Sequence, residues 1–434
     1  MTLTEGSRPG RGVVAADHVS LRRNNLSVVL RHVREMGSRS RARIAADTGL
    51  NKATVSSLVA ELVERGLLRE GLAESERGAL GRPGQLVELD GSGVCGVGAE
   101  INVDYLAVTA LDLSGVTVIE RRVPLDVAHL DPETTLDQLA ELIRHAVAAV
   151  DMRGGQTAGV TLAVPGLVQA ATGALKLAPN LGWTEVPVVA AMVERLGHPA
   201  YPVRVDNEAN LAALAAYAEM QAGPESRSQA GRNQLLPDGK VEDLVLLTGA
   251  VGVGGGMVSG GHLLRGGHGF SGEVGHMPVA PAGGTCGCGR TGCWETVVGL
   301  TALLNKATDP DDPVRDPSLD VEQRLAEITR RADEGDQRTL QALADVGNWL
   351  GIGGAILVNI LNPDVLVLGG YFAMLGPWLK ESLETAIRDR VIAPDGGGCR
   401  VIQSELGFTA AVRGGAQISL DQVFLDPTLV GRSE

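Results

Sequence analysis

The residues best suited to chemistry lie in one short stretch in the second half of the 434-residue chain. Three of the five cysteines, Cys286, Cys288 and Cys293, fall within eight positions, and His276 lies ten positions before the first of them. Three thiolates and one imidazole are the donor set of a four-coordinate zinc site. Because the protein supplies all four ligands, we predict a closed, structural site. The alternative is a glycine-rich loop with free thiols.

Two glutamates flank the predicted metal site. Glu273 precedes His276 by three positions and Glu295 follows Cys293 by two, so a zinc-braced loop would hold both carboxylates at fixed places. Paired carboxylates beside an imidazole suit sugar hydroxyls, because a buried polar group that the wrong epimer leaves unpaired costs about 1–3 kcal/mol. Spacing alone leaves open the alternative that both glutamates are solvated loop residues.

These segments resemble a family signature. The runs GEVGHMPV at 272–279 and CGCGRTGCWE at 286–295 are similar to the signature of the ROK family, named for repressors, open reading frames and kinases. Its members are sugar kinases and sugar-responsive transcription regulators. The resemblance implies that His276 and the three cysteines bind zinc. It also implies that the two glutamates and the second imidazole nitrogen contact a sugar, and it extends over essentially the whole chain.

Three further stretches resemble the family's sugar pocket. The resemblance implies sugar-binding roles for Gly166, Asn180, Asp206 and Asn207. In the family's kinases, the aspartate that matches Asp206 is the general base that deprotonates the attacking hydroxyl. Asp and Asn also cap helices, so capping is an equal alternative for the pair at 206–207.

A nucleotide site has weaker support. The segment 247–256 has the form of a phosphate loop, although close strand packing also selects glycine. Its candidate residues are Thr248, Gly249, Gly252 and Gly254. Family kinases carry Asp-x-Gly-Gly-Thr in an earlier hairpin, where this chain has Asn102-Val103-Asp104 in place of Gly-Gly-Thr. Phosphoryl transfer depends on positioning and charge neutralisation, so we predict no enzyme and no catalytic residue. Nucleotide as a bound co-effector stays open.

The elements that position these residues form a long α/β body. Alternating apolar patterns predict the order β-β-β-α-β, which resembles the first lobe of an actin-like ATPase. Its elements span 94–112 (a strand pair), 117–124, 134–150 and 159–164. A second lobe is predicted with strands at 243–247, 257–259 and 365–368, a glycine loop at 249–256 and a long helix at 339–361. A last helix near 410–424 is expected to pack back on the first lobe.

The N-terminal part has a different pattern. Three helices are predicted over 21–36, 41–48 and 51–62, with Ser38 or Ser40 capping the second and Asn51 the third. A Gly-Arg-Pro-Gly segment at 81–84 closes a β-hairpin wing, which makes a winged helix-turn-helix. The predicted DNA contacts are Arg41, Asn51, Lys52, Thr54, Ser56, Ser57 and, in the minor groove, Arg82. The alternative is a three-helix cap used for dimerisation.

Charge and composition agree with this division. The net charge is −14, but residues 1–90 carry 14 Lys and Arg against 11 Asp and Glu, so the remainder is strongly acidic. A weakly basic head on an acidic body suits a protein in which the head alone meets DNA. No stretch reads as a membrane span or secretory signal, and clustered cysteines suit a reducing compartment. We therefore expect a cytoplasmic protein with no membrane partner.

The predicted fold class is α/β: an actin-like, RNase H-like two-lobed body (the ROK fold) preceded by an all-α winged helix-turn-helix domain. The predicted parts are a disordered arm (1–18), the DNA-binding domain (19–90), the first lobe (91–210, with helix 410–425 packing back on it) and the second lobe with its zinc loop (211–409). We predict a homodimer or tetramer that binds a pseudo-palindromic operator and whose DNA affinity a sugar in the interlobe cleft modulates, most simply a repressor. The alternative is a sugar kinase with an added DNA-binding head.

Overall fold

A computed structural model describes residues 18–73, 85–221, 241–392 and 399–432. These residues form two compact units. One unit comprises the described residues up to Asp90 together with those from Gln422 onward, and the other comprises Gly91–Asp421. We refer to them as the head and the body. Most of the predicted N-terminal arm, and Arg82, lie outside the described residues.

The head is a winged helix-turn-helix, as predicted. Its helices and strands are α1 (His18–Met36), β1 (Arg39–Ser40), α2 (Arg41–Thr48), α3 (Lys52–Glu64), β2 (Leu68–Ala73) and β3 (Gln85–Leu89), with the strands in the order β1-β3-β2. Ser40 caps α2 and Asn51 caps α3, each by accepting a backbone N–H. Between these helices Gly49 has φ +74°, a left-handed turn in which glycine is unstrained. Local capping therefore sets the angle between α2 and α3.

The C-terminal end of the chain belongs to the head. The Oγ of Ser27 in α1 donates to the carbonyl oxygen of Phe424 (2.7 Å), and the guanidinium of Arg34 lies 4.2 Å from the centroid of the Phe424 ring. Arg65 donates to the carbonyl oxygen of Val430. We call residues 422–432 the C-terminal strap. It completes the hydrophobic surface of the head from the opposite end of the sequence.

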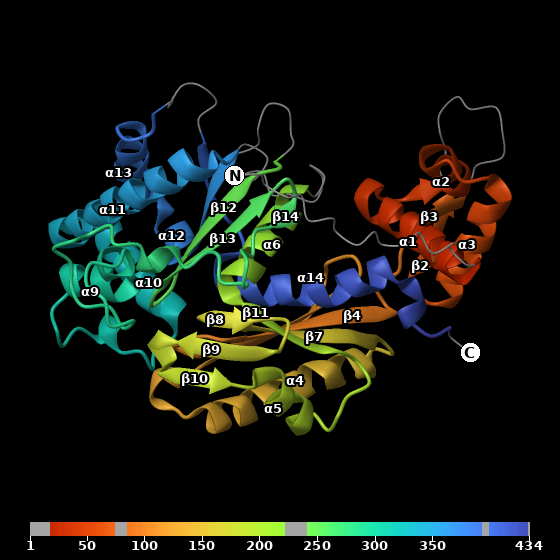
Figure 1. The fold of residues 1–434 in the computed structure, drawn as a ribbon, viewed down its shortest axis with the longest axis horizontal. Coiled ribbons are helices and arrows are strands. Elements are labelled where there is room, and N and C mark those ends of the chain that lie inside the picture. The colour runs from red at the N-terminus through yellow and green to blue at the C-terminus, as the bar shows by residue number, and fades with distance from the viewer. Residues whose placement is uncertain (1–17, 74–84, 222–240, 393–398, 433–434) are drawn as a thin grey trace, which may run out of the picture. The chain divides into compact units, whose positions relative to one another are not determined.

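The body contains two sheets of the same design (Figure 1). The first has the order β11-β7-β4-β5-β6 and the second β14-β13-β12-β15-β16. In each, three strands pair antiparallel and the next two join in parallel. The strands are β4 (Val94–Ile101), β5 (Tyr105–Asp112), β6 (Thr117–Pro124), β7 (Gln156–Val164), β11 (Val203–Asn207), β12 (Leu244–Gly249), β13 (Val253–Ser259), β14 (His262–Leu263), β15 (Val365–Gly370) and β16 (Arg400–Gln403). This repeated topology gives the predicted two-lobed actin-like body.

Helices and one small sheet cover these two sheets. The small sheet consists of β8 (Leu167–Gln169), β9 (Ala174–Ala178) and β10 (Trp183–Val186). The α-helices of the body are α4 (Pro132–Met152), α5 (Val188–Arg195), α6 (Glu208–Gln221), α8 (Glu295–Val298), α9 (Leu300–Ala307), α10 (Val321–Asp333), α11 (Gln337–Leu361), α12 (Tyr371–Met374) and α13 (Gly376–Arg388), together with most of α14 (Ala410–Leu425).

Helix α14 lies directly on strand β4, and α4 covers the other face of the first sheet (Figure 1). A Cβ atom on Gly98 would lie 1.8 Å from the carbonyl oxygen of Val412, so only glycine allows this approach. The Oγ of Ser419 lies 2.8 Å from Oγ1 of Thr161 on β7. The last helix therefore packs on the first sheet of the body before the chain enters the head.

Helix α11 corrects one expectation. By length and composition this 25-residue helix could cross a membrane. However, 56% of its apolar 18-residue segment is buried inside the protein. Packing explains this composition, because a Cβ on Gly351 would lie 2.5 Å from the carbonyl oxygen of Leu383 in α13. The helix is a core element of the second lobe.

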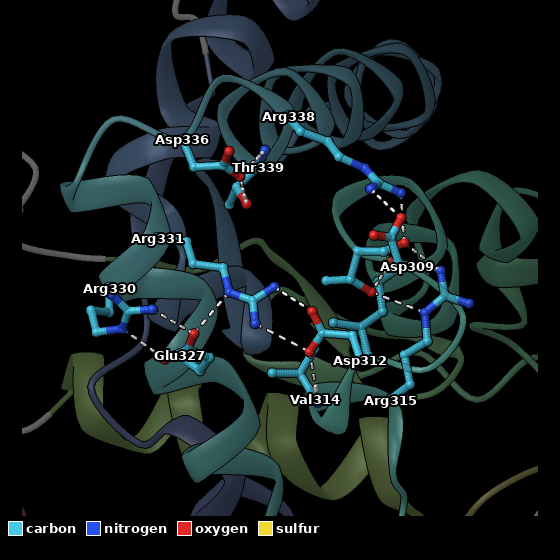
Figure 2. A network of polar contacts seen from close by, with 12 residues as sticks. Asp309, Asp312, Val314, Arg315, Glu327, Arg330, Arg331, Asp336, Arg338 and Thr339 are labelled. Carbon is cyan, nitrogen blue, oxygen red and sulfur yellow. Dashed lines mark hydrogen bonds and ion pairs between the residues drawn. The ribbon is translucent and has the colours of Figure 1, made fainter.

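A polar network lies beside the N-terminus of α11 (Figure 2). Arg331 bridges Asp312 and Glu327, and this network fastens α10 to the preceding loop.

We expect Phe424→Ala to loosen the head. Phe424 is 3% exposed, and deleting such a ring costs about 3–5 kcal/mol. Amide hydrogen exchange of the whole protein should speed up in α1 and α3 and stay unchanged in β4 and β7. The control is the adjacent Leu425→Ala, since Leu425 is 57% exposed. Equal exchange in the two variants would contradict a structural role for the strap.

Candidate metal centre and adjoining pocket

The four predicted metal ligands lie together. The donor atoms of His276, Cys286, Cys288 and Cys293 are all within 4.8 Å of one another. The Sγ of Cys286 is 3.5 Å from Nδ1 of His276, and the Sγ atoms of Cys288 and Cys293 are 3.6 Å apart. Zn–S bonds of about 2.3 Å place tetrahedral ligand atoms roughly 3.8 Å apart, so the donor set fits a zinc ion. Zinc held by these residues would brace the loop and leave no open coordination position.

Backbone geometry brings the cysteines together. The N–H of Cys286 donates to the carbonyl oxygen of Arg290 (2.8 Å), which closes a tight turn. Gly292 has φ +78°, and a Cβ there would lie 2.3 Å from the carbonyl oxygen of Ala280. Trp294 is fully buried, and its indole N–H donates to the carbonyl oxygen of Trp349 in α11 (2.8 Å). The loop is therefore anchored independently of the metal.

The flanking glutamates face the imidazole. Nε2 of His276 is 3.9 Å from the carboxylate of Glu273, and Nδ1 is 3.9 Å from that of Glu295. Since Nδ1 also lies beside Cys286, the imidazole presents Nδ1 to the metal donors and Nε2 to Glu273. Burial, and then the charge of Glu295, raise the pKa of Glu273.

A pocket adjoins this centre at the carboxyl ends of parallel strands, where α/β proteins commonly bind ligands. Glu100, Ala163 and Asp206 are in register across β4, β7 and β11, which brings the loops that follow them to one edge. Of the predicted sugar-binding residues, Gly166, Asn180, Asn207, Glu273, His276 and Glu295 line the pocket. Of the predicted phosphate-loop residues, Thr248, Gly252 and Gly254 line it and Gly249 does not.

Asp206 is the predicted sugar-binding residue that the pocket lining leaves out. Its two carboxylate oxygens accept from Nη1 (3.0 Å) and Nη2 (2.6 Å) of Arg265, and one of them also accepts from the N–H of Asn207. The bidentate pairing turns Asp206 into a structural link between β11 and the segment after β14. Asn207 caps α6 through the N–H groups of Ala209 and Asn210, so the capping alternative holds for it.

The sequence analysis overlooked Glu208. This glutamate is the first residue of α6 and lines the pocket next to Asn207, whose Nδ2 donates to it (2.9 Å). Burial, followed by the charges of Glu273 and Glu100, raises its pKa well above the usual value. The signal in the sequence was its place at the end of a strand beside two Asx residues.

The altered hairpin between β4 and β5 forms a closed polar cluster. The Tyr105 hydroxyl (2.9 Å) and Nδ2 of Asn102 (3.1 Å) both donate to Oε1 of Glu100. All three side chains line the pocket together with Val103. Asp104, the last residue of the altered motif, does not line the pocket and pairs with Arg324 at 3.3 Å. Glu100 is thus the carboxylate that this hairpin brings to the pocket.

The predicted glycine loop is mostly a strand. Gly254, Gly255 and Gly256 belong to β13 and pair with β12. A Cβ on Gly256 would lie 2.4 Å from the carbonyl oxygen of Ala209, so close packing on α6 requires glycine. In the short connection between the strands, a Cβ on Gly252 would lie 2.8 Å from Nδ2 of Asn180. The packing alternative therefore accounts for these glycines.

The predicted DNA contacts of the head differ in availability. Asn51, Lys52, Ser56 and Ser57 are exposed, and Thr54 is partly buried. Ser57 accepts a hydrogen bond from Arg22 at 3.3 Å. Arg41 is paired with Glu70. The apolar stripe of α3 that opposes these residues is buried; it comprises Val55, Leu58, Val59 and Leu62.

Comparison with known proteins decides the family. The sequence model of the ROK family matches residues 96–422. The chain belongs to the ROK family. The model of the IclR helix-turn-helix domain matches residues 26–71, which lie in the head. Because the ROK match covers most of the body, the family also accounts for the two-lobed fold.

Related ROK proteins are both repressors and kinases. A putative xylose repressor of Caldicellulosiruptor sp. (strain Rt8B.4) is 30% identical over 420 residues, which cover 95% of this chain and 100% of that protein. A glucokinase of Halalkalibacterium halodurans is 34% identical over 275 residues, which cover 61% of this chain and 76% of that protein. The crystal structure of a ROK family transcriptional regulator, a homologue of the E. coli MLC protein, matches 94% of this chain and 98% of its own with a TM-score of 0.71 and 23% identity. The repressor match therefore includes the head.

We expect Cys288→Ser to lose the metal. Replacing one of four thiolate or imidazole donors opens a closed zinc site, so zinc measured on the purified protein should fall from about one ion per chain to a small fraction. Cys399→Ser is the control, because Cys399 lies outside the cluster. Zinc retained by Cys288→Ser, or absent from the unaltered protein, would contradict the assignment.

We expect the difference in stability between the unaltered protein and Glu100→Gln to depend on pH. Burial raises its pKa from 4.5 to about 7, against the opposing hydrogen bonds from Asn102 and Tyr105. Because the folded pKa is the higher one, the contribution of Glu100 to stability is complete below pH 4.5 and is lost as the pH rises through 7. Glu100→Gln cannot ionise, so its free energy of unfolding relative to the unaltered protein should rise by about 3 kcal/mol between about pH 5 and pH 8. Glu120→Gln, an exposed position, should show no such trend; a flat difference for Glu100→Gln would contradict the raised pKa.

Proposed function

We propose that this ROK protein is a cytoplasmic, sugar-responsive transcriptional repressor. One observation carries the proposal: a winged helix-turn-helix head is joined to a ROK body whose pocket retains hydroxyl-binding groups and has lost the phosphate-binding glycine pair. The xylose repressor match over 95% of the chain supports the same function. A head of this kind distinguishes regulators from kinases, whose match here is confined to part of the chain.

The head is suited to DNA at the start of α3. Asn51, Lys52 and Ser56 are exposed there, and short polar side chains at a helix N-terminus reach base edges and phosphates in the major groove. Arg41, Thr54, Ser57 and Arg82 complete the proposed contact set. A homodimer or tetramer would place two recognition helices about one helical turn apart on a pseudo-palindromic operator.

The body is suited to a sugar. Carboxylates, an amide and an imidazole line its pocket through Glu273, Glu295, Asn180 and His276, and such groups bind hydroxyls in pairs. Gly166 lines the same pocket, and Asp206 would act indirectly by fixing Asn207. We propose that sugar binding shifts the population between two arrangements of the lobes and changes DNA affinity by a coupling free energy of about 1–3 kcal/mol.

The alternative is a sugar kinase with an added head, in keeping with the kinase relatives. Two observations favour the regulator. Asn102 and Val103 occupy the place of the glycine pair, and a β-branched side chain blocks the close backbone approach that a phosphate needs. The carboxylate of Asp206 is held by Arg265 in two hydrogen bonds, so it is not free to accept a proton from a substrate.

Selection of genomic fragments by the purified protein, with and without a panel of sugars, tests this function. We expect specific fragments that one sugar releases. Glu273→Ala should bind the same fragments with unchanged affinity, because the head is unaltered. The sugar should no longer release these fragments, because the pocket has lost a hydroxyl-binding carboxylate. Glu120→Ala, at an exposed position on β6, should behave like the unaltered protein. No specific fragment would refute the regulator, and release that persists in Glu273→Ala would refute the sugar site.

A further inference from the structure

Acidic side chains surround the pocket from four separate elements. Glu100 comes from the end of β4, Glu208 from the start of α6, Glu273 precedes the metal ligand His276, and Glu295 begins α8. Among the described residues that line the pocket there is no lysine or arginine. The imidazole of His276 is directed at the metal donors through Nδ1. The pocket therefore offers no cationic side chain to an anionic ligand.

The neighbouring arginines are committed to other carboxylates. Both terminal nitrogens of Arg265 donate hydrogen bonds to the carboxylate of Asp206. Arg122, whose guanidinium lies 5.6 Å from the centroid of the Tyr105 ring, pairs with Asp320 (3.3 Å) and Glu322 (2.9 Å). Neither arginine is a lining residue. A phosphate in the pocket would have to break one of these pairs to gain a cation.

The backbone does not replace the missing cations. Backbone N–H groups of a glycine loop can bind phosphate when they point into an open concavity. Here Gly254 is paired with Thr248 across two antiparallel strands. At Gly252, a Cβ would lie only 3.0 Å from Oε2 of Glu295. A carboxylate therefore occupies the space beside the one short connection that resembles a phosphate loop.

Glu100 has an unused acceptor in the pocket. Its side chain is 2% exposed, and Oε1 accepts from Tyr105 and Asn102. Oε2 is buried and has no hydrogen-bond partner among the described residues. Since buried polar atoms in folded proteins are nearly always paired, this oxygen is the atom that a ligand would satisfy. The ionised carboxylate accepts at this oxygen, so the group that satisfies it there donates a hydrogen bond, as a hydroxyl or an ammonium does.

We infer that the pocket selects a sugar or amino sugar that carries no phosphate, with one hydroxyl or ammonium group donating to Oε2 of Glu100. The inference rests on the proposed sugar-responsive function and specifies the class of its effector. The hairpin that in family kinases approaches the phosphates of a nucleotide becomes here part of the sugar-selective wall. The side chains that bind hydroxyls leave a phosphate ester without a cationic partner, so the protein would respond to a sugar before its phosphorylation and not after it.

Titration calorimetry with the zinc-loaded full chain tests this inference on matched pairs. The probes are glucose and glucose 6-phosphate, glucosamine and glucosamine 6-phosphate, and xylose and xylose 5-phosphate. We expect one unphosphorylated sugar to bind and its phosphate ester to have an affinity lower by about tenfold or more. A factor of this size corresponds to one hydrogen bond to a charged group. Glu100→Gln should weaken the bound sugar by a similar factor and narrow the gap between sugar and ester. Glu120→Gln should change neither.

The outcomes separate this inference from the function on which it rests. A phosphate ester that binds as tightly as its parent sugar, or more tightly, overturns the inference and leaves a sugar-responsive regulator intact. Failure of every probe to bind, while specific DNA fragments are still retained, overturns the sugar response and the inference together. Unchanged sugar affinity in a folded Glu100→Gln overturns the role of Glu100. The comparison within pairs uses the unaltered protein, so it stands even if that variant does not fold.

Discussion

The burial of Trp294 against α11 is the contact on which the rest of the site depends. A Cβ on Gly353 would lie 2.2 Å from the indole ring, so the helix leaves space for this one side chain. Trp294 stands between Cys293 and Glu295 in the sequence. Its anchorage therefore fixes a metal ligand on one side and a pocket carboxylate on the other. The buried indole and the backbone contacts of the loop position its donors, with the Sγ atoms of Cys288 and Cys293 3.6 Å apart, so zinc would bind to residues that packing already orients.

The body uses one topology twice and gives the two copies different tasks. In the first sheet, strand ends bring Glu100 and the pair of Asn207 and Glu208 to one edge. In the second, glycines of β13 allow α6 to lie close against the sheet. A scaffold shared with kinases thus carries an acidic pocket here, and the altered hairpin contributes Glu100 to it. The change required no new element, since Asn102 and Tyr105 simply satisfy the glutamate that replaces a phosphate partner.

Features set by near neighbours in the sequence were predictable, and those set by distant partners were not. The caps Ser40 and Asn51 and the metal donors follow from local spacing, and the repeated strand patterns announced the two lobes. The pairing of Asp206 with Arg265 joins residues 59 positions apart, so no local pattern revealed that this carboxylate is occupied. The glycines of β13 fit either a phosphate loop or close packing in the sequence, because their partner, α6, is identified only by the structure. Glu208 was overlooked for the same reason: the pocket that it lines is formed by segments far apart in the sequence.

The strap formed by residues 422–432 has a consequence for how the protein is made. Phe424 and Val430 complete the head through Ser27 and Arg65, yet they follow the whole body in the sequence. Helices α1 to α3 precede the body in the sequence, so the whole body must be synthesised before their final surface is covered. A chain that terminates early therefore leaves an unfinished head. The head is also not an N-terminal cassette: exchanging it between relatives would require moving both ends of the chain together.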